Sequence, residues 1–277
     1  MAGTLYLVPT PIGNLGDISP RMADTLAQAD FVAAEDTRVS LKLLNHLGIK
    51  KPMVSYHRHN VESGGQAVIS RLMAGESCAL VTDAGMPAIS DPGEELVAEC
   101  AQLGIDVVVI PGPCALVAAL AASGQPTGRF TFEGFLPMNK RNRRAHLESL
   151  RGETRTMIFY EAPHKLNATL KDLAAAFGGE RPVSLCRELS KLHEEIRRTT
   201  LGAAVSHYEV NQPKGEFVLV VRGAEPVEEK EITLEDGLAL VERLREEGAS
   251  LRDAVKRAAK ELNLPRNQLY DLAVNNK

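Results

Sequence analysis

The densest set of reactive side chains lies at residues 187–195, which read Arg-Glu-Leu-Ser-Lys-Leu-His-Glu-Glu. Carboxylate, ammonium and imidazole groups occur there within a few residues, directly after a predicted strand at 183–187. Groups of these types can move a proton or stabilise a developing negative charge. The alternative is a solvated charged loop, which is the usual role of a charge run. The position directly after a strand favours a functional site.

Basic side chains are most concentrated on a predicted helix at residues 140–150. Lys140, Arg141, Arg143 and Arg144 lie close together near its start. A patch of this kind neutralises phosphate groups and gives affinity without reading a base sequence. The chain as a whole carries a formal net charge of -4, so this patch is local and no general basic coat exists. A solvated helix face is the alternative.

Three loops rich in glycine and proline follow predicted strands, at residues 9–17, 82–93 and 111–115. Glycine permits close approach of the backbone and proline stiffens it, so such loops can present main-chain groups to a flat, polar small molecule. The first loop has neither the G-x-G-x-x-G nor the G-x-x-x-x-G-K-[ST] pattern, which argues against a standard dinucleotide or nucleoside triphosphate site. Plain strand-to-helix turns are the alternative.

Two adjacent acids, Glu35 and Asp36, end another predicted strand. Buried and unpaired carboxylates are costly. Either Arg38 neutralises them, or they meet a cationic or hydroxylated ligand. A structural Asp–Arg pair is the simpler expectation for at least one of the two.

The loops must be held by a sheet, and the first half of the chain predicts one. Short apolar runs at 4–8, 30–34, 77–82 and 105–110 alternate with segments of helical period. This alternation indicates βαβ units and a mostly parallel sheet in a domain at 1–124. Ligands bind beyond the carboxyl ends of the strands in such sheets, which is where the loops begin.

The pattern changes after a turn-rich segment at 124–128. Alternating runs and helical stretches then predict a second α/β domain with a mixed sheet, at 125–224. Residues 225–277 predict a linker and a helical extension, whose last two helices meet at a break at 263–265 and resemble a helix-turn-helix. This extension either contacts RNA or the ribosome, or packs for stability or dimer contact.

Composition excludes several classes of protein. Hydrophobic residues make up 44% and charged residues 25%, as in soluble globular chains rather than disordered or fibrous ones. We expect no membrane span and no signal peptide, since the apolar runs are short and the N-terminus lacks a basic start. The four cysteines form no C-x-x-C pair, so we expect no metal site and a cytoplasmic location.

The motifs taken together, in this order, resemble the tetrapyrrole methylase family and, within it, a bacterial subgroup. The resemblance rests on eight segments: PTPIGNLGDIS, AAEDTR, SYHRHN, TDAGMPAISDPG, GFLP with the basic helix after it, FYEAPHKL, RELSKLHEE and KGEFV. It covers roughly residues 1–224, and the C-terminal extension is also similar. It implies two α/β domains of tetrapyrrole methylase type with a cofactor cleft between them.

The resemblance further implies that the cofactor is S-adenosylmethionine. The family's cofactor-binding segments correspond to Pro11, Ile12, Gly13, Asp83, Ala84, Gly85, Pro87, Ser90, Cys114, Ala115, Tyr160, Glu161, Ala162, Gly215 and Glu216.

Members of the subgroup methylate a cytidine ribose 2′-hydroxyl in the decoding centre of small-subunit (16S) ribosomal RNA. The resemblance therefore implies ribosomal RNA or the assembled small subunit as partner, and a homodimer. A ribose hydroxyl is a poor nucleophile and needs a base or a nearby cation. We expect Lys191 or Glu188 beside the hydroxyl, Arg187 on a phosphate, and the basic patch of Lys140, Arg141, Arg143 and Arg144 on RNA.

Other functions remain open on the residues alone. One alternative is a methyltransferase for a tetrapyrrole such as a precorrin, although such a substrate needs neither the basic patch nor the C-terminal helices. A non-catalytic ribosome-binding protein of the same fold is another, and a diphthine-type protein methyltransferase is a weaker one.

Overall fold

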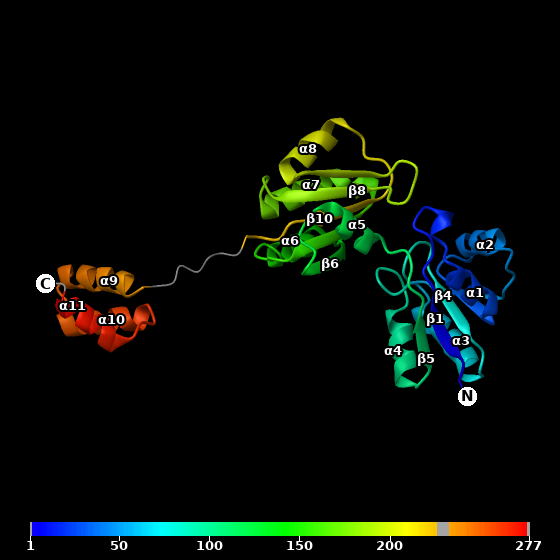
Figure 1. Ribbon diagram of the computed structural model, residues 1–277, viewed down its shortest axis with the longest axis horizontal. Coiled ribbons are helices and arrows are strands. Elements are labelled where there is room, and N and C mark those ends of the chain that lie inside the picture. Colours follow the sequence, from blue (N-terminus) through cyan, green and yellow to red (C-terminus); the bar gives the residue numbers. More distant parts are fainter. Residues whose placement is uncertain (1, 226–232, 276–277) are drawn as a thin grey trace. The chain divides into compact units, whose positions relative to one another are not determined.

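The structure is a computed structural model, and it describes residues 2–225 and 233–275. The chain divides into two compact units, Met1–Ala224 and Glu225–Lys277. The first unit contains two five-stranded sheets, and the described part of the second contains three helices (Figure 1). In the part of the chain that is described, no helix is both long and apolar enough to span a bilayer.

The first sheet is entirely parallel and has the strand order β3-β2-β4-β1-β5. Its strands are β1 (Thr4–Leu7), β2 (Phe31–Ala34), β3 (Met53–Ser55), β4 (Cys78–Val81) and β5 (Asp106–Val109). The helices between them are η1 (Leu15–Asp17), α1 (Pro20–Gln28), α2 (Thr37–His46), α3 (Val61–Met73) and α4 (Glu94–Gln102). The predicted parallel sheet is therefore confirmed.

Both faces of this sheet are covered by helices. Met22 and Leu26 of α1 and Leu44 of α2 pack on one face, whereas α3 and α4 pack on the other. Every residue of β2 and β4 is buried, which explains why these strands read as continuous apolar runs.

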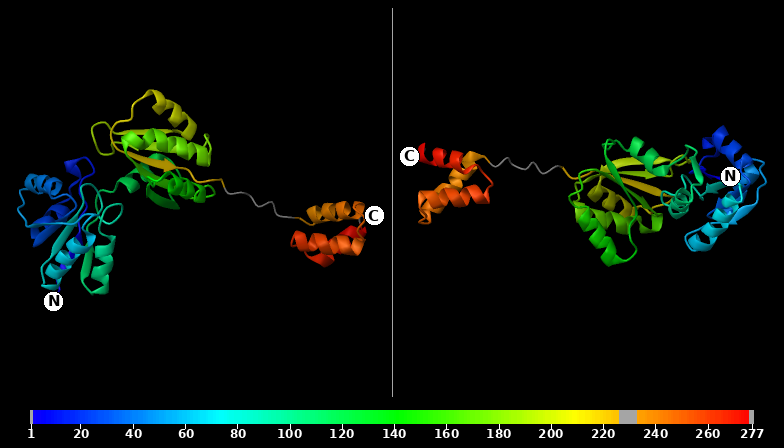
Figure 2. Two further views of the ribbon diagram at one scale, coloured as in Figure 1. Left: turned by 180° about the vertical axis from the view of Figure 1, so that it is seen from behind. Right: turned by 90° about the horizontal axis from the view of Figure 1, so that it is seen from below.

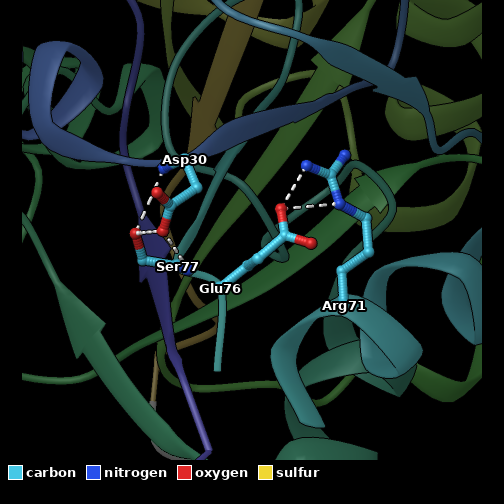
Figure 3. Close-up of polar contacts among 4 residues, drawn as sticks. All are labelled: Asp30, Arg71, Glu76 and Ser77. Atoms are coloured by element: carbon cyan, nitrogen blue, oxygen red, sulfur yellow. Dashed lines mark hydrogen bonds and ion pairs between the residues drawn. The ribbon is translucent and has the colours of Figure 1, made fainter. Parts of the chain in front are cut away.

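Polar contacts fix the amino-terminal edge of the sheet, away from the loops that follow the strands (Figure 3). The Asp30 carboxylate, just before β2, accepts hydrogen bonds from the Ser77 backbone N–H and hydroxyl, both at 2.7 Å. Arg71 pairs with Glu76 and places its guanidinium 3.6 Å from the centre of the Phe31 ring. These contacts join the starts of β2 and β4 to α3.

The second sheet is mixed and has the order β6-β7-β10-β8-β9. Its strands are β6 (Phe130–Phe135), β7 (Thr156–Glu161), β8 (Pro182–Arg187), β9 (Glu195–Thr200) and β10 (Phe217–Val221), and only β6 and β7 are parallel. One face is covered by α6 (Lys140–Ser149), α7 (Pro163–Phe177) and α8 (Leu201–Val210).

The other face of the second sheet is covered by α5 (Ala115–Ser123), whose residues precede the boundary expected at 124. Leu116, Ala119 and Leu120 pack against Val218 and Val220 of β10. The Ser184 hydroxyl of β8 also donates to the Ser123 carbonyl at 2.8 Å. The helix that follows β5 thus joins the two sheets, which Figure 2 shows from two further sides.

The C-terminal unit contains α9 (Leu234–Glu246), α10 (Leu251–Glu261) and α11 (Arg266–Asn275). Ser250 caps α10 by accepting from the Asp253 backbone N–H at 3.2 Å. Leu240, Val241 and Leu244 of α9 form a small core with Val255 and Leu269. The predicted helical hairpin is confirmed within this unit, and most of the predicted linker lies outside the described residues.

Candidate active site

A cavity of about 460 Å³ lies between the loops at the carboxyl edge of the first sheet and the ends of β7, β8 and β10. Its walls are mainly apolar, with a small number of carboxylates and backbone groups. Cavities that bind small molecules have volumes of roughly 300–1,000 Å³ and walls of this composition. The position beyond the strand ends is the one expected for an open parallel sheet.

Two loops of the first domain are joined to each other on one side of the cavity. Thr10 and Gly85 exchange backbone hydrogen bonds at 2.9 and 3.0 Å, and the Thr10 hydroxyl donates to the Thr82 carbonyl at 3.1 Å. Gly85 has a φ of 87°, a left-handed conformation that glycine adopts readily. The turn after β4 is thus held against the loop after β1.

Three of the acids in the cavity wall, Glu35, Asp83 and Asp91, come from loops of the first domain. Burial raises the pKa of each, and mutual repulsion raises the pKa of Glu35 and Asp91 further. Arg58 partly offsets the repulsion at Glu35 and Asp91. Clustered carboxylates at the edge of a mainly apolar cavity favour a ligand that carries positive charge.

Asp36, by contrast, is paired outside the cavity wall. Arg38 binds its carboxylate through Nε at 3.0 Å and Nη2 at 2.6 Å, and this pairing lowers the pKa of Asp36 to about 2. The two acids that follow β2 therefore differ in their surroundings: Arg38 neutralises Asp36, and Glu35 lines the cavity.

Aromatic residues of the second domain complete another part of the wall. The Tyr160 hydroxyl accepts a hydrogen bond from the Leu116 backbone N–H at 3.1 Å, at the start of α5. Burial strongly raises the pKa of Tyr160, so the hydroxyl stays neutral. The Phe135 ring lies edge-on to Tyr160, with centroids 5.7 Å apart. These contacts fix the ring that lines the cavity.

Lys191 lies beside the cavity in the turn between β8 and β9. Its Nζ contacts Glu188 Oε1 at 2.9 Å and Glu216 Oε2 at 2.8 Å. Burial by itself would lower the pKa of Lys191, but the hydrogen bonds that Lys191 donates to both carboxylates outweigh burial and raise it. The Lys191 hydrogen bond is the main cause that lowers the pKa of Glu188. Both groups are therefore charged near neutral pH.

Two glycines allow this cluster to form. A Cβ on Gly13 would lie 2.3 Å from Lys191 Cγ, and a Cβ on Gly215 would lie 2.5 Å from Glu188 Cδ. The loop after β1 thus packs directly on the lysine stem. The Ser190 hydroxyl also donates to Asp17, at the end of the same loop.

The structure brings most of the predicted cofactor residues together at the cavity, and their role in binding stays a prediction. Those that line it are Ile12, Asp83, Ala84, Gly85, Ser90, Cys114, Ala115, Tyr160, Glu161, Ala162 and Glu216. Pro11, Gly13, Pro87 and Gly215 are not in the lining, and neither are Lys191 and Glu188, which reach it through Glu216.

Several lining residues were not among the predicted site residues. They are Glu35, Met86, Ile89, Asp91, Phe135, Pro163, Cys186, Leu189, Phe217 and Val218. Glu35 and Asp91 could have been identified from the sequence, because each is an acid in a loop after a predicted strand. Met86 and Ile89 lie in the predicted ligand loop at 82–93. The apolar strand residues Cys186, Phe217 and Val218 carried no signal, since a wall residue and a core residue of a strand have the same pattern.

The predicted RNA-binding residues differ in their surroundings. Lys140, Arg141 and Arg144 are exposed on α6. The side chain of Arg143 is only 14% exposed and forms an ion pair with Asp172 of α7 at 2.6 Å. Arg187 pairs with Glu195 across the β8–β9 turn at 2.9 Å. Three cations of the patch thus face solvent, whereas Arg143 turns inward toward α7.

Comparison with known proteins agrees with this architecture. Residues 4–205 match the model of the Tetrapyrrole (Corrin/Porphyrin) Methylases, and residues 231–277 match the RsmI C-terminal HTH domain. The chain belongs to the tetrapyrrole methylase family.

Three relatives with high identity share one name. A protein of Synechocystis is 49% identical over 98% of both chains, and one of Pseudomonas aeruginosa is 47% identical over 99% of this chain and 97% of its own. A protein of Bacillus subtilis is 45% identical over 97% of this chain and 93% of its own. Each is named ribosomal RNA small subunit methyltransferase I.

Solved structures share the fold at low identity. Diphthine synthase has a TM-score of 0.60 at 16% identity, over 79% of this chain and 90% of its own. A uroporphyrin-III C-methyltransferase from Thermus thermophilus was solved with S-adenyl homocysteine. It has a TM-score of 0.56 at 17% identity, over 79% of this chain and 97% of its own. The family's methylases use S-adenosylmethionine, and the chain is accordingly an S-adenosylmethionine-dependent methyltransferase.

The residues present fit this cofactor. S-adenosylmethionine combines a flat adenine, a ribose with hydroxyl groups and a positively charged sulfonium. The cavity offers apolar and aromatic walls for the adenine. For the ribose hydroxyls and the sulfonium it offers carboxylates whose pKa values are raised by burial and by their mutual repulsion.

Proposed function

We propose that this chain methylates the ribose 2′-hydroxyl of a cytidine in the decoding centre of small-subunit ribosomal RNA. The carrying observation is similarity at 41–49% identity over nearly the whole chain to relatives named ribosomal RNA small subunit methyltransferase I. The similarity extends through the C-terminal unit, which a tetrapyrrole substrate would not require.

RNA binding is supported by the exposed part of the basic patch. Lys140, Arg141 and Arg144 present three cations on one helix of a chain with net charge -4. Such side chains neutralise backbone phosphates and position the RNA without specifying its sequence. Arg187 is a further candidate phosphate contact near the cavity.

The cofactor supplies an electrophilic methyl group on a cationic sulfur. A ribose hydroxyl attacks weakly until its proton is lost, because the neutral oxygen is a poor nucleophile. The proton passes to water, and a nearby cation stabilises the negative charge that develops on the oxygen as the proton leaves. Lys191 remains protonated and carries hydrogens that can stabilise this charge. Glu188 accepts from both Lys191 Nζ and the Glu216 backbone N–H at 2.9 Å, so it holds the ammonium group in place. We assign Lys191 as the residue at the hydroxyl and Glu188 as its support.

The proposal includes a cytoplasmic site of action, where small ribosomal subunits are found, and a homodimer, as the family resemblance implies. We assign RNA or subunit contact to the C-terminal helices as well. The alternative, a hairpin packed for stability or dimer contact, predicts that RNA affinity is unchanged when these helices are removed.

The test replaces Lys191 with methionine, which keeps the aliphatic stem on Gly13 and removes only the charge. We expect Lys191→Met to lower the methylation rate of small ribosomal subunits by at least about a hundredfold, within the range for loss of one electrostatic contact. The dissociation constant for S-adenosylmethionine, measured by calorimetry, should change by less than about threefold.

Lys171→Met is the matched control, because Lys171 is an exposed lysine that pairs only on the surface with Glu209. It should leave rate and affinity unchanged. A normal methylation rate in Lys191→Met would show that the catalytic assignment is wrong.

A further inference from the structure

A series of buried hydrogen bonds leads from the interior of the second domain to the cavity wall. Glu161 lines the cavity at the end of β7 and is 4% exposed. Its Oε1 accepts from the Ala162 backbone N–H at 2.9 Å, and its Oε2 accepts from the Thr169 hydroxyl. Thr169 lies on α7 and is 1% exposed. A carboxylate in such surroundings depends on these donors, because little water can replace them.

Arg143 determines the direction in which hydrogen bonds are donated along this series. Its Nη2 donates to Thr169 Oγ1 at 3.2 Å and pairs with Asp172 at 2.6 Å. A hydroxyl has one hydrogen, and guanidinium has only donors. Since Arg143 donates to the Thr169 oxygen, the single Thr169 hydrogen is left to bind Glu161. The order of donation is therefore Arg143 to Thr169 to Glu161.

We propose that Arg143 and Thr169 are positioning residues of the cofactor site. Neither lines the cavity, but together they hold the Glu161 carboxylate and, through its bond to Ala162, the wall formed by Glu161, Ala162 and Pro163. Without Arg143, the Thr169 hydroxyl is free to rotate and Glu161 loses a fixed donor. The role is independent of which acceptor is methylated.

This assignment separates Arg143 from its neighbours on α6. Lys140, Arg141 and Arg144 are exposed and available to RNA, whereas Arg143 is enclosed by α7. One helix then serves two purposes: its outer face carries the phosphate-binding cations, and its inner face supports the cofactor cavity.

The experiment measures binding of S-adenosylhomocysteine to Arg143→Met, Thr169→Val and the double variant by calorimetry. Each single variant should weaken binding about tenfold. The double variant should be no weaker than the weaker single variant, because both break one chain. Arg143→Lys, which can still donate to Thr169, should recover most of the affinity. Arg141→Met, an exposed arginine of the same helix, should bind normally.

Thermal unfolding of every variant is recorded in parallel. A purely structural role for Arg143 would lower the melting temperature while leaving the dissociation constant within about twofold of the wild type, and that result would overturn the assignment. Additive losses in the double variant would overturn it too. Loss of RNA methylation with normal cofactor binding in Arg143→Met would instead return Arg143 to the RNA-binding patch.

Discussion

At the residue scale, the ionised carboxylates in the cavity wall are destabilised by burial and by mutual repulsion, and a cationic ligand would reduce this cost. Asp91 shows this best, since burial raises its pKa, and Asp83 raises it further while Arg58 opposes them. A carboxyl whose folded-state pKa is raised destabilises the fold above that pKa. The penalty disappears as the pH falls and the group becomes protonated.

We therefore expect Asp91→Asn to stabilise the ligand-free protein at pH 7–8. The gain in free energy of unfolding should be below about 1 kcal/mol, because solvent screens the site. The gain should shrink as the pH falls through the Asp91 pKa, in urea unfolding at a series of pH values. The same variant should bind S-adenosylmethionine roughly fivefold more weakly, which corresponds to about 1 kcal/mol.

Asp24→Asn provides the control, because Asp24 is exposed on α1 away from the cavity. It should change neither property. If Asp91→Asn destabilised the protein at neutral pH, or bound the cofactor as tightly as the wild type, the electrostatic account of the cavity would fail.

At the element scale, the turn between β8 and β9 and the loop after β1 are in direct contact. The antiparallel register pairs Arg187 of β8 with Phe217 of β10, so Glu188 and Glu216 come together just beyond the strand ends. The loop after β1 completes the cluster because Gly13 leaves room for the Lys191 stem. Each part comes from a different region of the sequence.

Gly13→Ala should therefore displace Lys191. An added Cβ would lie 2.3 Å from Lys191 Cγ, so the lysine must move. A displacement of about 1 Å can cost about a hundredfold in rate, and we expect a loss of that order in subunit methylation. In a Lys191→Met background the same substitution should cost little more.

Gly152→Ala is the matched control, since no atom lies within 4 Å of the added Cβ. Its rate should equal that of the wild type. Normal methylation by Gly13→Ala would mean that the contact between the loop and Lys191 has no part in the reaction.

Elements differ in how well the sequence predicts them. The buried strands β2 and β4 are continuous apolar runs and are recognised directly. The edge strands β3 and β9 are not, because β3 has three residues and β9 reads Glu-Ile-Arg-Arg-Thr-Thr. An edge strand is paired on one side only and needs no apolar run. The loops that carry the site were identifiable, whereas their mutual contacts depend on register.

At the scale of the whole molecule, the sequence predicted two α/β domains and a helical extension, and both sheets and the helices are present. It did not indicate that α5 follows the last strand of the first sheet yet packs on the second. A helix of alanines and leucines suits either sheet, and the choice is made by long-range contacts such as that between Ser123 and Ser184.

The most direct test of the central claim is to map the methyl group. Small ribosomal subunits from cells lacking this chain are incubated with the purified protein and S-adenosylmethionine, and the RNA is then digested and analysed by mass spectrometry. The account predicts 2′-O-methylcytidine in the fragment that contains the decoding centre. Methylation of a base, of a site outside that fragment, or of no RNA at all would contradict it.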